Sequence, residues 1–167
     1  MRALARTIIP TDEASPGAED ACVVEGLGRM VAGSRERQSI YEPGLLAFDE
    51  LAFREHGRSF VGLTEAERSA LLRYVDELRL RTADNRSMLT KIWSRIRRLY
   101  LEWDGSLAAV DLFPVLVQDV MRVFYTHPIS WVWLGYDGPP MPHGYPGGIE
   151  RSSDVQRSEY ERVGLWA

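Results

Sequence analysis

The C-terminal part of the chain constrains the fold most, because residues 124–148 combine many large aromatic side chains with prolines and glycines. Proline lacks a backbone N–H and glycine weakens regular structure, so such a segment does not continue as a helix or a central strand. We therefore expect residues 127–167 to form a long irregular tail. A chain of 167 residues has only a modest core in which to bury these rings. Some of them are expected to contact another protein, which is typical of an accessory subunit.

The tail aromatics have two interpretations. Trp131 and Trp133 are two residues apart, so their side chains would point to the same side of an extended segment. Residues 144–148 predict a chain reversal that presents Tyr145. Either the tail folds back over the helices and buries the rings, or the rings bind a partner, because Trp and Tyr dominate binding hot spots; both can hold for different rings. The residues predicted to bind a partner are Trp131, Trp133, Tyr136, Tyr145, Pro146 and Gly147.

Upstream of the tail, apolar residues recur at helical spacing, and no segment alternates as a half-buried strand does. The capping box of Thr64 and Glu67 marks the clearest helix start. Asp20 is expected to cap another helix, and Pro114 to kink or split the last one. An all-α fold follows: a single-domain bundle of five or six helices over residues 1–126, with the tail of residues 127–167 packed on it and on a partner subunit. The predicted helices cover residues 3–9, 20–31, 43–56, 64–81, 87–102 and 107–125.

The charge balance argues against several classes of partner. A net charge of -4 disfavours nucleic acid or an anionic membrane as the main partner. The single cysteine, Cys22, makes no internal disulfide and no zinc or iron–sulfur site alone; it is expected to be a small buried side chain or to bond another subunit. No run approaches the roughly 20 apolar residues of a membrane span. No leader is visible, so the expected location is cytoplasmic as the sequence stands, or periplasmic if a twin-arginine leader is supplied.

No residue set in the chain is predicted to be catalytic, to bind a cofactor or to bind a metal. No Gly-x-Gly-x-x-Gly motif follows a strand, so a dinucleotide fold is not expected. The three histidines do not recur at metal-binding spacing. His56 is expected at a helix C-terminus, and His127 is expected to satisfy loop backbone. An acid–base role remains open for His127 or His143, although spacing ties no nucleophile or carboxylate to either one.

A basic belt follows the two helices predicted on either side of residue 84. It is either a solvated face or an ion-pairing surface for an acidic partner. Acidic residues near the N-terminus, such as Asp12 and Glu19, are an internal alternative for neutralising it. The belt consists of Arg79, Arg81, Arg86, Lys91, Arg95, Arg97 and Arg98.

Three segments together resemble the gluconate 2-dehydrogenase subunit 3 family, the small subunits of sugar and polyol dehydrogenases. Their order and spacing carry the resemblance over most of residues 3–148. The segment between Asp84 and Gly105 is longer than in a typical member. The segments are Leu-Ala-Arg-Thr-Ile-Ile-Pro-Thr-Asp at 4–12 with Ser-Pro-Gly-Ala at 15–18, Gly-Leu-Leu-Ala-Phe-Asp at 44–49 with residues 57–64, and Phe-Tyr-Thr-His-Pro at 124–128 with Gly-Tyr at 135–136 and Gly-Tyr-Pro-Gly at 144–147.

The resemblance implies a small subunit that does not catalyse. In that family it binds a large flavoprotein of the glucose–methanol–choline type, which carries FAD and oxidises an alcohol carbon of a sugar. Electrons pass on to a cytochrome c or another acceptor, and the small subunit helps the large one to mature. The chain is therefore expected to stabilise such a partner; the alternatives are a self-associating helical adaptor or an independent enzyme that uses His127 or His143.

Overall fold

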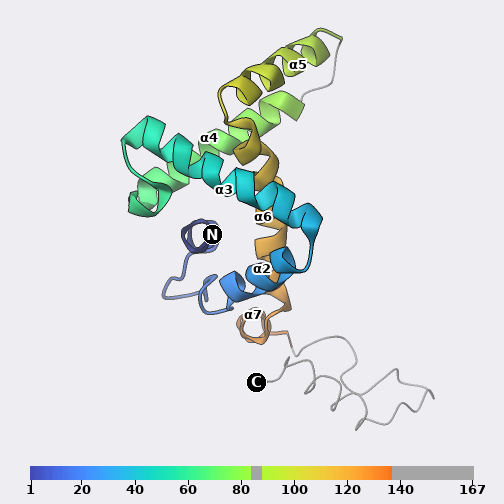
Figure 1. The fold of residues 1–167 in the computed structure, drawn as a ribbon. Coiled ribbons are helices and arrows are strands. Elements are labelled where there is room, and N and C mark those ends of the chain that lie inside the picture. Colours follow the sequence, from blue (N-terminus) through green and yellow to red (C-terminus); the bar gives the residue numbers. More distant parts are fainter. Residues whose placement is uncertain (84–87, 137–167) are drawn as a thin grey trace, which may run out of the picture.

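The protein is all-α in the computed structural model, which describes residues 1–83 and 88–136 (Figure 1). No strand occurs in these two ranges, so the predicted fold class is confirmed. None of the helices in them is long and apolar enough to cross a membrane. The elements are α1 (Arg2–Ile8), α2 (Val23–Ala32), α3 (Arg35–His56), the 3₁₀ turn η1 (Phe60–Gly62), α4 (Glu65–Ala83), α5 (Met88–Trp103), α6 (Leu107–Thr126) and α7 (Pro128–Leu134).

Helices α3 and α6 form the central pair of the bundle, and α2 packs against both. They approach closely because α3 carries Gly44 at the crossing, where an added Cβ would lie 2.4 Å from the Cβ of Leu112. Phe48, Leu112 and Leu116 are fully buried around this crossing. Helix α1 lies against α2, α4 and α6 and closes one side of the core.

Two parts of the fold lie at opposite ends of α6. Helix α4 packs against α1 and α6, and its C-terminal end pairs with α5 in an antiparallel hairpin that projects from the bundle, whereas α7 follows the other end of α6 (Figure 1). Helix α5 contacts only α4 and the beginning of α6 among the principal helix pairs. Much of the surface of α5 is therefore left uncovered by the bundle.

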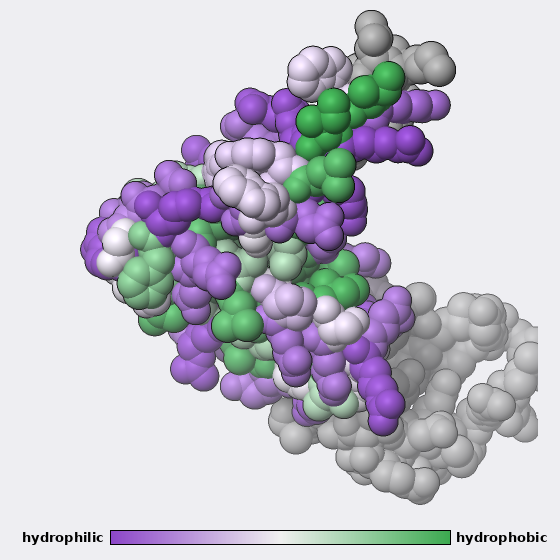
Figure 2. Space-filling model, turned by 45° about the horizontal axis from the view of Figure 1, so that its top comes forward, coloured by the Kyte–Doolittle hydropathy of each residue, from purple (hydrophilic) through white to green (hydrophobic). Residues whose placement is uncertain are grey.

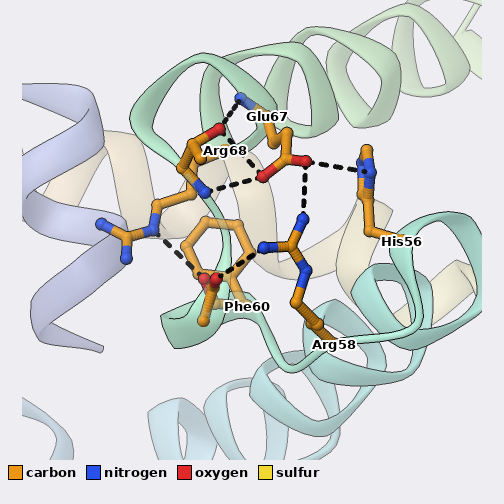
Figure 3. Close-up of polar contacts among 7 residues, drawn as sticks. His56, Arg58, Phe60, Glu67 and Arg68 are labelled. Carbon is orange, nitrogen blue, oxygen red and sulfur yellow. Dashed lines mark hydrogen bonds and ion pairs between the residues drawn. The ribbon is translucent and has the colours of Figure 1, made fainter.

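The predicted capping box at the start of α4 is confirmed. The Glu67 carboxylate accepts hydrogen bonds from the Thr64 backbone N–H at 2.7 Å and hydroxyl at 2.8 Å, and the Glu67 N–H returns one to that hydroxyl at 3.3 Å. The same carboxylate lies 2.8 Å from Arg58 and 3.7 Å from His56, the last residue of α3 (Figure 3). Arg68 donates to the Phe60 carbonyl at 3.1 Å. These contacts fix the corner between α3 and α4.

Helix α3 begins eight residues earlier than predicted, because Pro43 does not start it. The Ser34 hydroxyl caps the helix by accepting from the Arg37 N–H at 3.3 Å. Proline removes one helical hydrogen bond to the carbonyl four residues earlier. Both Pro43 and Ser39 are exposed, so water can satisfy that carbonyl and the helix continues. Helix α6 likewise continues across Pro114 and is not split.

The predicted cap at Asp20 is wrong. Helix α2 begins at Val23 after Cys22, whose φ of 47° is in the left-handed region. Asp20 instead accepts hydrogen bonds from the Gly17 N–H at 2.7 Å and the Thr11 hydroxyl at 2.9 Å. Cys22 is also exposed rather than buried. The loop before α2 therefore uses the carboxylate that was expected to cap the helix.

The first part of the predicted irregular tail is helical. Pro128 occupies the first turn of α7, where a missing N–H costs nothing, and Gly135 ends the helix with a positive φ of 67°. The proline and glycine thus mark the two ends of one short helix. The expected packing of residues 137–167 lies outside the described residues and stays a prediction.

Candidate partner-binding surfaces

The loop between α1 and α2 is held by two aspartates. The Asp12 carboxylate accepts from the N–H groups of Ala14 at 2.8 Å and Ser15 at 2.7 Å. The Asp20 carboxylate accepts from the Gly17 N–H and from the Thr11 hydroxyl. An added Cβ at Gly17 would lie 2.3 Å from the Thr11 hydroxyl oxygen, so only glycine fits this turn. The Ala18 N–H donates to the Ile9 carbonyl at 2.9 Å and closes the loop.

Both aspartates of this loop favour their charged forms. The Ala14 N–H holds the pKa of Asp12 below its usual value, with further help from Ser15. The Gly17 N–H does the same for the pKa of Asp20, and the Thr11 hydroxyl adds to it. A carboxylate that accepts several hydrogen bonds is stabilised in its ionised form. Both carboxylates are consequently ionised at neutral pH, the form that accepts these hydrogen bonds.

Helix α7 is fixed to the end of α6 by side-chain hydrogen bonds. His127 Nδ1 accepts from the Ile129 N–H at 3.3 Å and caps α7. The fully buried Ser130 hydroxyl donates to the Phe124 carbonyl at 2.6 Å, and Trp131 Nε1 donates to the Tyr125 carbonyl at 2.7 Å. The expectation that His127 satisfies local backbone is confirmed.

Trp133 joins α7 to the N-terminal loop, 119 residues away in sequence. Its Nε1 donates to the Ala14 carbonyl at 2.9 Å. Beside this contact lies an open pocket of about 250 Å³. The fold therefore brings the first and third of the resembling segments into one surface. The pocket is lined by Ile8, Ile9, Pro10, Asp12, Ser15, Pro16, Met121, Phe124, Tyr125 and Trp133.

Large apolar side chains remain exposed around this junction. Their exposed fractions range from 36% for Met121 to 80% for Val132. We call this set the α7 surface; it consists of Met121, Tyr125, Ile129, Val132, Trp133 and Tyr136.

The structure places three of the six predicted partner-binding residues. Trp133 and Tyr136 are exposed, whereas Trp131 is half-buried with its ring 6.2 Å from that of Tyr136. The expectation that Trp131 and Trp133 point to the same side is wrong, because residues two apart in a helix differ by about 200°. Tyr145, Pro146 and Gly147 lie outside the described residues.

A second exposed apolar surface lies on α5, and no predicted binding residue belongs to it. Side chains that recur along one side of this helix are between 50% and 83% exposed. Figure 2 shows green and near-white side chains along the projecting end of the molecule, between purple ones. Helical spacing revealed the helix, but not that this side faces away from the core. We call this set the α5 stripe; it consists of Ile92, Trp93, Ile96, Leu99, Tyr100 and Trp103.

The buried polar cluster between α3 and α6 has a structural role. Asp119, 3% exposed, accepts from Arg37 Nε at 2.9 Å and from the Tyr41 hydroxyl at 3.0 Å. Burial raises the pKa of Tyr41, and the Asp119 charge raises it further. The hydrogen bond to Asp119 also raises the pKa of Arg37. This ion pair satisfies a carboxylate inside the bundle.

The histidines that sequence analysis left open for acid–base chemistry are only partly described. His127 is a helix cap, and His143 lies outside the described residues. Across residues 1–83 and 88–136, no three His, Cys, Asp or Glu side chains gather as metal ligands would.

The family model of gluconate 2-dehydrogenase subunit 3 matches residues 1–138. The chain belongs to this family, as the three resembling segments predicted. Comparisons with curated proteins and with solved structures gave no significant match.

Proposed function

We propose that the chain is a non-catalytic small subunit that binds and stabilises a large FAD-dependent oxidoreductase of the glucose–methanol–choline type. The large subunit would hold the FAD and oxidise a sugar or related alcohol, with electrons passing to a cytochrome c or another acceptor. Membership of the gluconate 2-dehydrogenase subunit 3 family supports a role within such a complex.

The observation that carries this proposal is the α7 surface. Its six side chains leave on the order of 500 Å² of apolar area exposed, taking roughly 150–250 Å² for each large side chain. That area is at the upper end of the roughly 300–600 Å² found for the largest patch on a typical monomer. Trp and Tyr are the residues most enriched at binding hot spots. The hydrogen bond from Trp133 to Ala14 holds the surface in place before a partner arrives.

Binding of this kind stabilises a partner by mass action. A subunit that binds the folded, FAD-loaded flavoprotein and not its unfolded chain raises the free energy of unfolding by about 2.7 kcal/mol at a hundredfold excess over Kd. The small subunit then supports maturation without contributing a catalytic group.

Co-expression tests the proposal with a matched pair of variants. Val132 is 80% exposed on the α7 surface, and Val61 is 69% exposed on η1. A carboxylate at position 132 would be desolvated in the interface, whereas one at position 61 stays in water. We expect the wild-type chain and Val61→Asp to increase the yield of FAD-loaded flavoprotein, and Val132→Asp to lose most of that increase. A flavoprotein that folds, loads FAD and turns over equally well without this chain would refute the proposal.

A further inference from the structure

We infer that the α5 stripe is a second docking surface, which fits an apolar groove bordered by carboxylates on the flavoprotein subunit. The inference rests on the proposed function and adds a contact that lies at the opposite end of α6 from α7 (Figure 1).

The α5 stripe points away from the core of the protein. At about 100° per residue, its six positions fall within about 120° of the helix circumference. Ser94 and Leu101 are the buried residues of the described part of α5, and both lie on the opposite side, against the body of the protein. An amphipathic helix normally turns its apolar side to the core. Helix α5 does the reverse, so its own bundle leaves the apolar side uncovered.

The α5 stripe exposes a large apolar area. The side chains are 50–83% exposed, and Trp103 is the most exposed of them. Together they leave roughly 700 Å² of apolar surface, again taking about 150–250 Å² for each side chain. A standard protein interface buries about 800 Å² on each partner. The stripe alone is therefore close to one side of a specific interface.

Charge identifies the kind of occupant. Helix α5 carries Lys91, Arg95, Arg97 and Arg98 against Glu102, a net charge of +3. The whole chain carries -4, so the rest of it carries -7. Arg98 pairs with Asp111 at 3.2 Å, but within the described residues no carboxylate lies within ion-pair distance of Lys91 or Arg95. At about 100° per residue, Arg95 and Arg97 lie about 40° beyond the two edges of the stripe, so a positive side chain flanks it on each side.

This charge pattern disfavours a second copy of the chain and a membrane. Two α5 helices that met through their stripes would bring +3 against +3, and like charges at an interface weaken binding. An anionic membrane would attract α5 but repel the remainder of the chain. A protein groove with carboxylates at its rim matches both the apolar stripe and the basic border.

The only lysine of the sequence, Lys91, lies within about 60° of the buried Ser94 on the helix circumference, so it is not at the edge of the stripe. Arg95→Lys combined with Lys91→Arg keeps the charge and leaves one side-chain amine, at position 95. A zero-length carbodiimide joins an amine to a carboxylate that is in ion-pair contact, and we expect it to link position 95 to an Asp or Glu of the FAD-loaded large subunit in the full-length complex. Lys91→Arg alone should give no such link and should not change Kd more than twofold.

A link from position 95 to the carboxylates of residues 150–161 would assign the stripe to the chain's own tail. A link between two copies would assign it to self-association. Either result overturns the inference. So does binding of the chain to anionic phospholipid vesicles that Leu99→Ser abolishes.

Affinity measurements use a matched pair of leucines. Leu99 in the stripe and Leu46 on α3 are both 66% exposed. Titrating the full-length chain against the FAD-loaded large subunit, we expect Leu99→Ser to raise Kd at least tenfold and Leu46→Ser less than twofold. Arg95→Glu should slow association severalfold and weaken its salt dependence, while the equivalent change at exposed Arg35 should not.

The two proposals fail in different ways. If the wild-type chain binds and the stripe variants bind equally well, the docking inference fails while the proposed function stands. If the wild-type chain shows no binding to the flavoprotein, both fail.

Discussion

Replacing Gly44 by alanine should separate the two central helices. An added Cβ would lie 2.4 Å from the Cβ of Leu112 and 3.0 Å from the Ala108 carbonyl oxygen. Non-bonded carbon atoms prefer about 3.5–4.0 Å, so α3 and α6 must move apart by roughly 1 Å. Neither contacting atom is the end of a flexible side chain, so the clash cannot be relieved by a rotamer change.

The size of the effect follows from two opposing terms. Overpacking a core costs about 1–3 kcal/mol, and the rigid contact at Gly44 puts this site near the upper limit. Alanine is favoured over glycine in a helix interior by about 1 kcal/mol. We therefore expect Gly44→Ala to lower the free energy of unfolding by about 2 kcal/mol. For a chain of this size, that lowers Tm by about 4–8 °C.

Gly28→Ala is the matched control, because Gly28 lies inside α2 and an added Cβ there meets nothing within 4 Å. It should gain the helical preference alone and raise the free energy of unfolding by up to about 1 kcal/mol. Urea unfolding followed by far-UV circular dichroism compares the two variants. If Gly44→Ala stabilises the protein as much as Gly28→Ala does, the close crossing of α3 and α6 is incorrect.

Two further predictions concern polar groups. Asp119→Ala should lower the free energy of unfolding by about 2–3 kcal/mol, because Arg37 and Tyr41 lose their hydrogen-bond acceptor. Tyr41→Phe should lower it by about 1.5 kcal/mol. Equal urea midpoints for Asp119→Ala and wild type would contradict this prediction. The pKa values of Asp12 and Asp20 are lower in the folded state than their ordinary value of 3.8. Their stabilising effect is present above that value and is lost as pH falls through the lower folded values. The urea midpoint should therefore fall more steeply below about pH 4 for wild type than for Asp12→Asn, and parallel curves would contradict the prediction.

The sequence predicted the helical class and most helix positions because these depend on local patterns. The Thr64–Glu67 capping box acts within four residues, and it occurs as expected. The errors arose where one residue type has two structural uses. Pro128 starts α7, although no regular element was expected after it, and Pro43 lies inside α3 rather than at the start of the predicted helix. Asp20 stabilises a loop instead of capping α2, a choice decided by its contacts with Thr11 and Gly17.

The candidate site was harder to predict than the fold. Aromatic density pointed to Trp133 and Tyr136, which are exposed. The contact between Trp133 and Ala14 joins distant segments, so no local pattern indicates it. The α5 stripe was missed for a different reason. The apolar period of α5 predicts a helix with one apolar side, but the period is the same whether that side covers its own core or another protein.

Hydrogen exchange of the full-length chain, free and mixed with the FAD-loaded flavoprotein, shows whether the exposed apolar surfaces of this chain bind that partner. The backbone amides of α5 and of α7 after Pro128 are predicted to exchange more slowly on binding. The amides in the middle of α3 should change little. Unchanged exchange in both α5 and α7, with protection elsewhere or nowhere, would contradict the account.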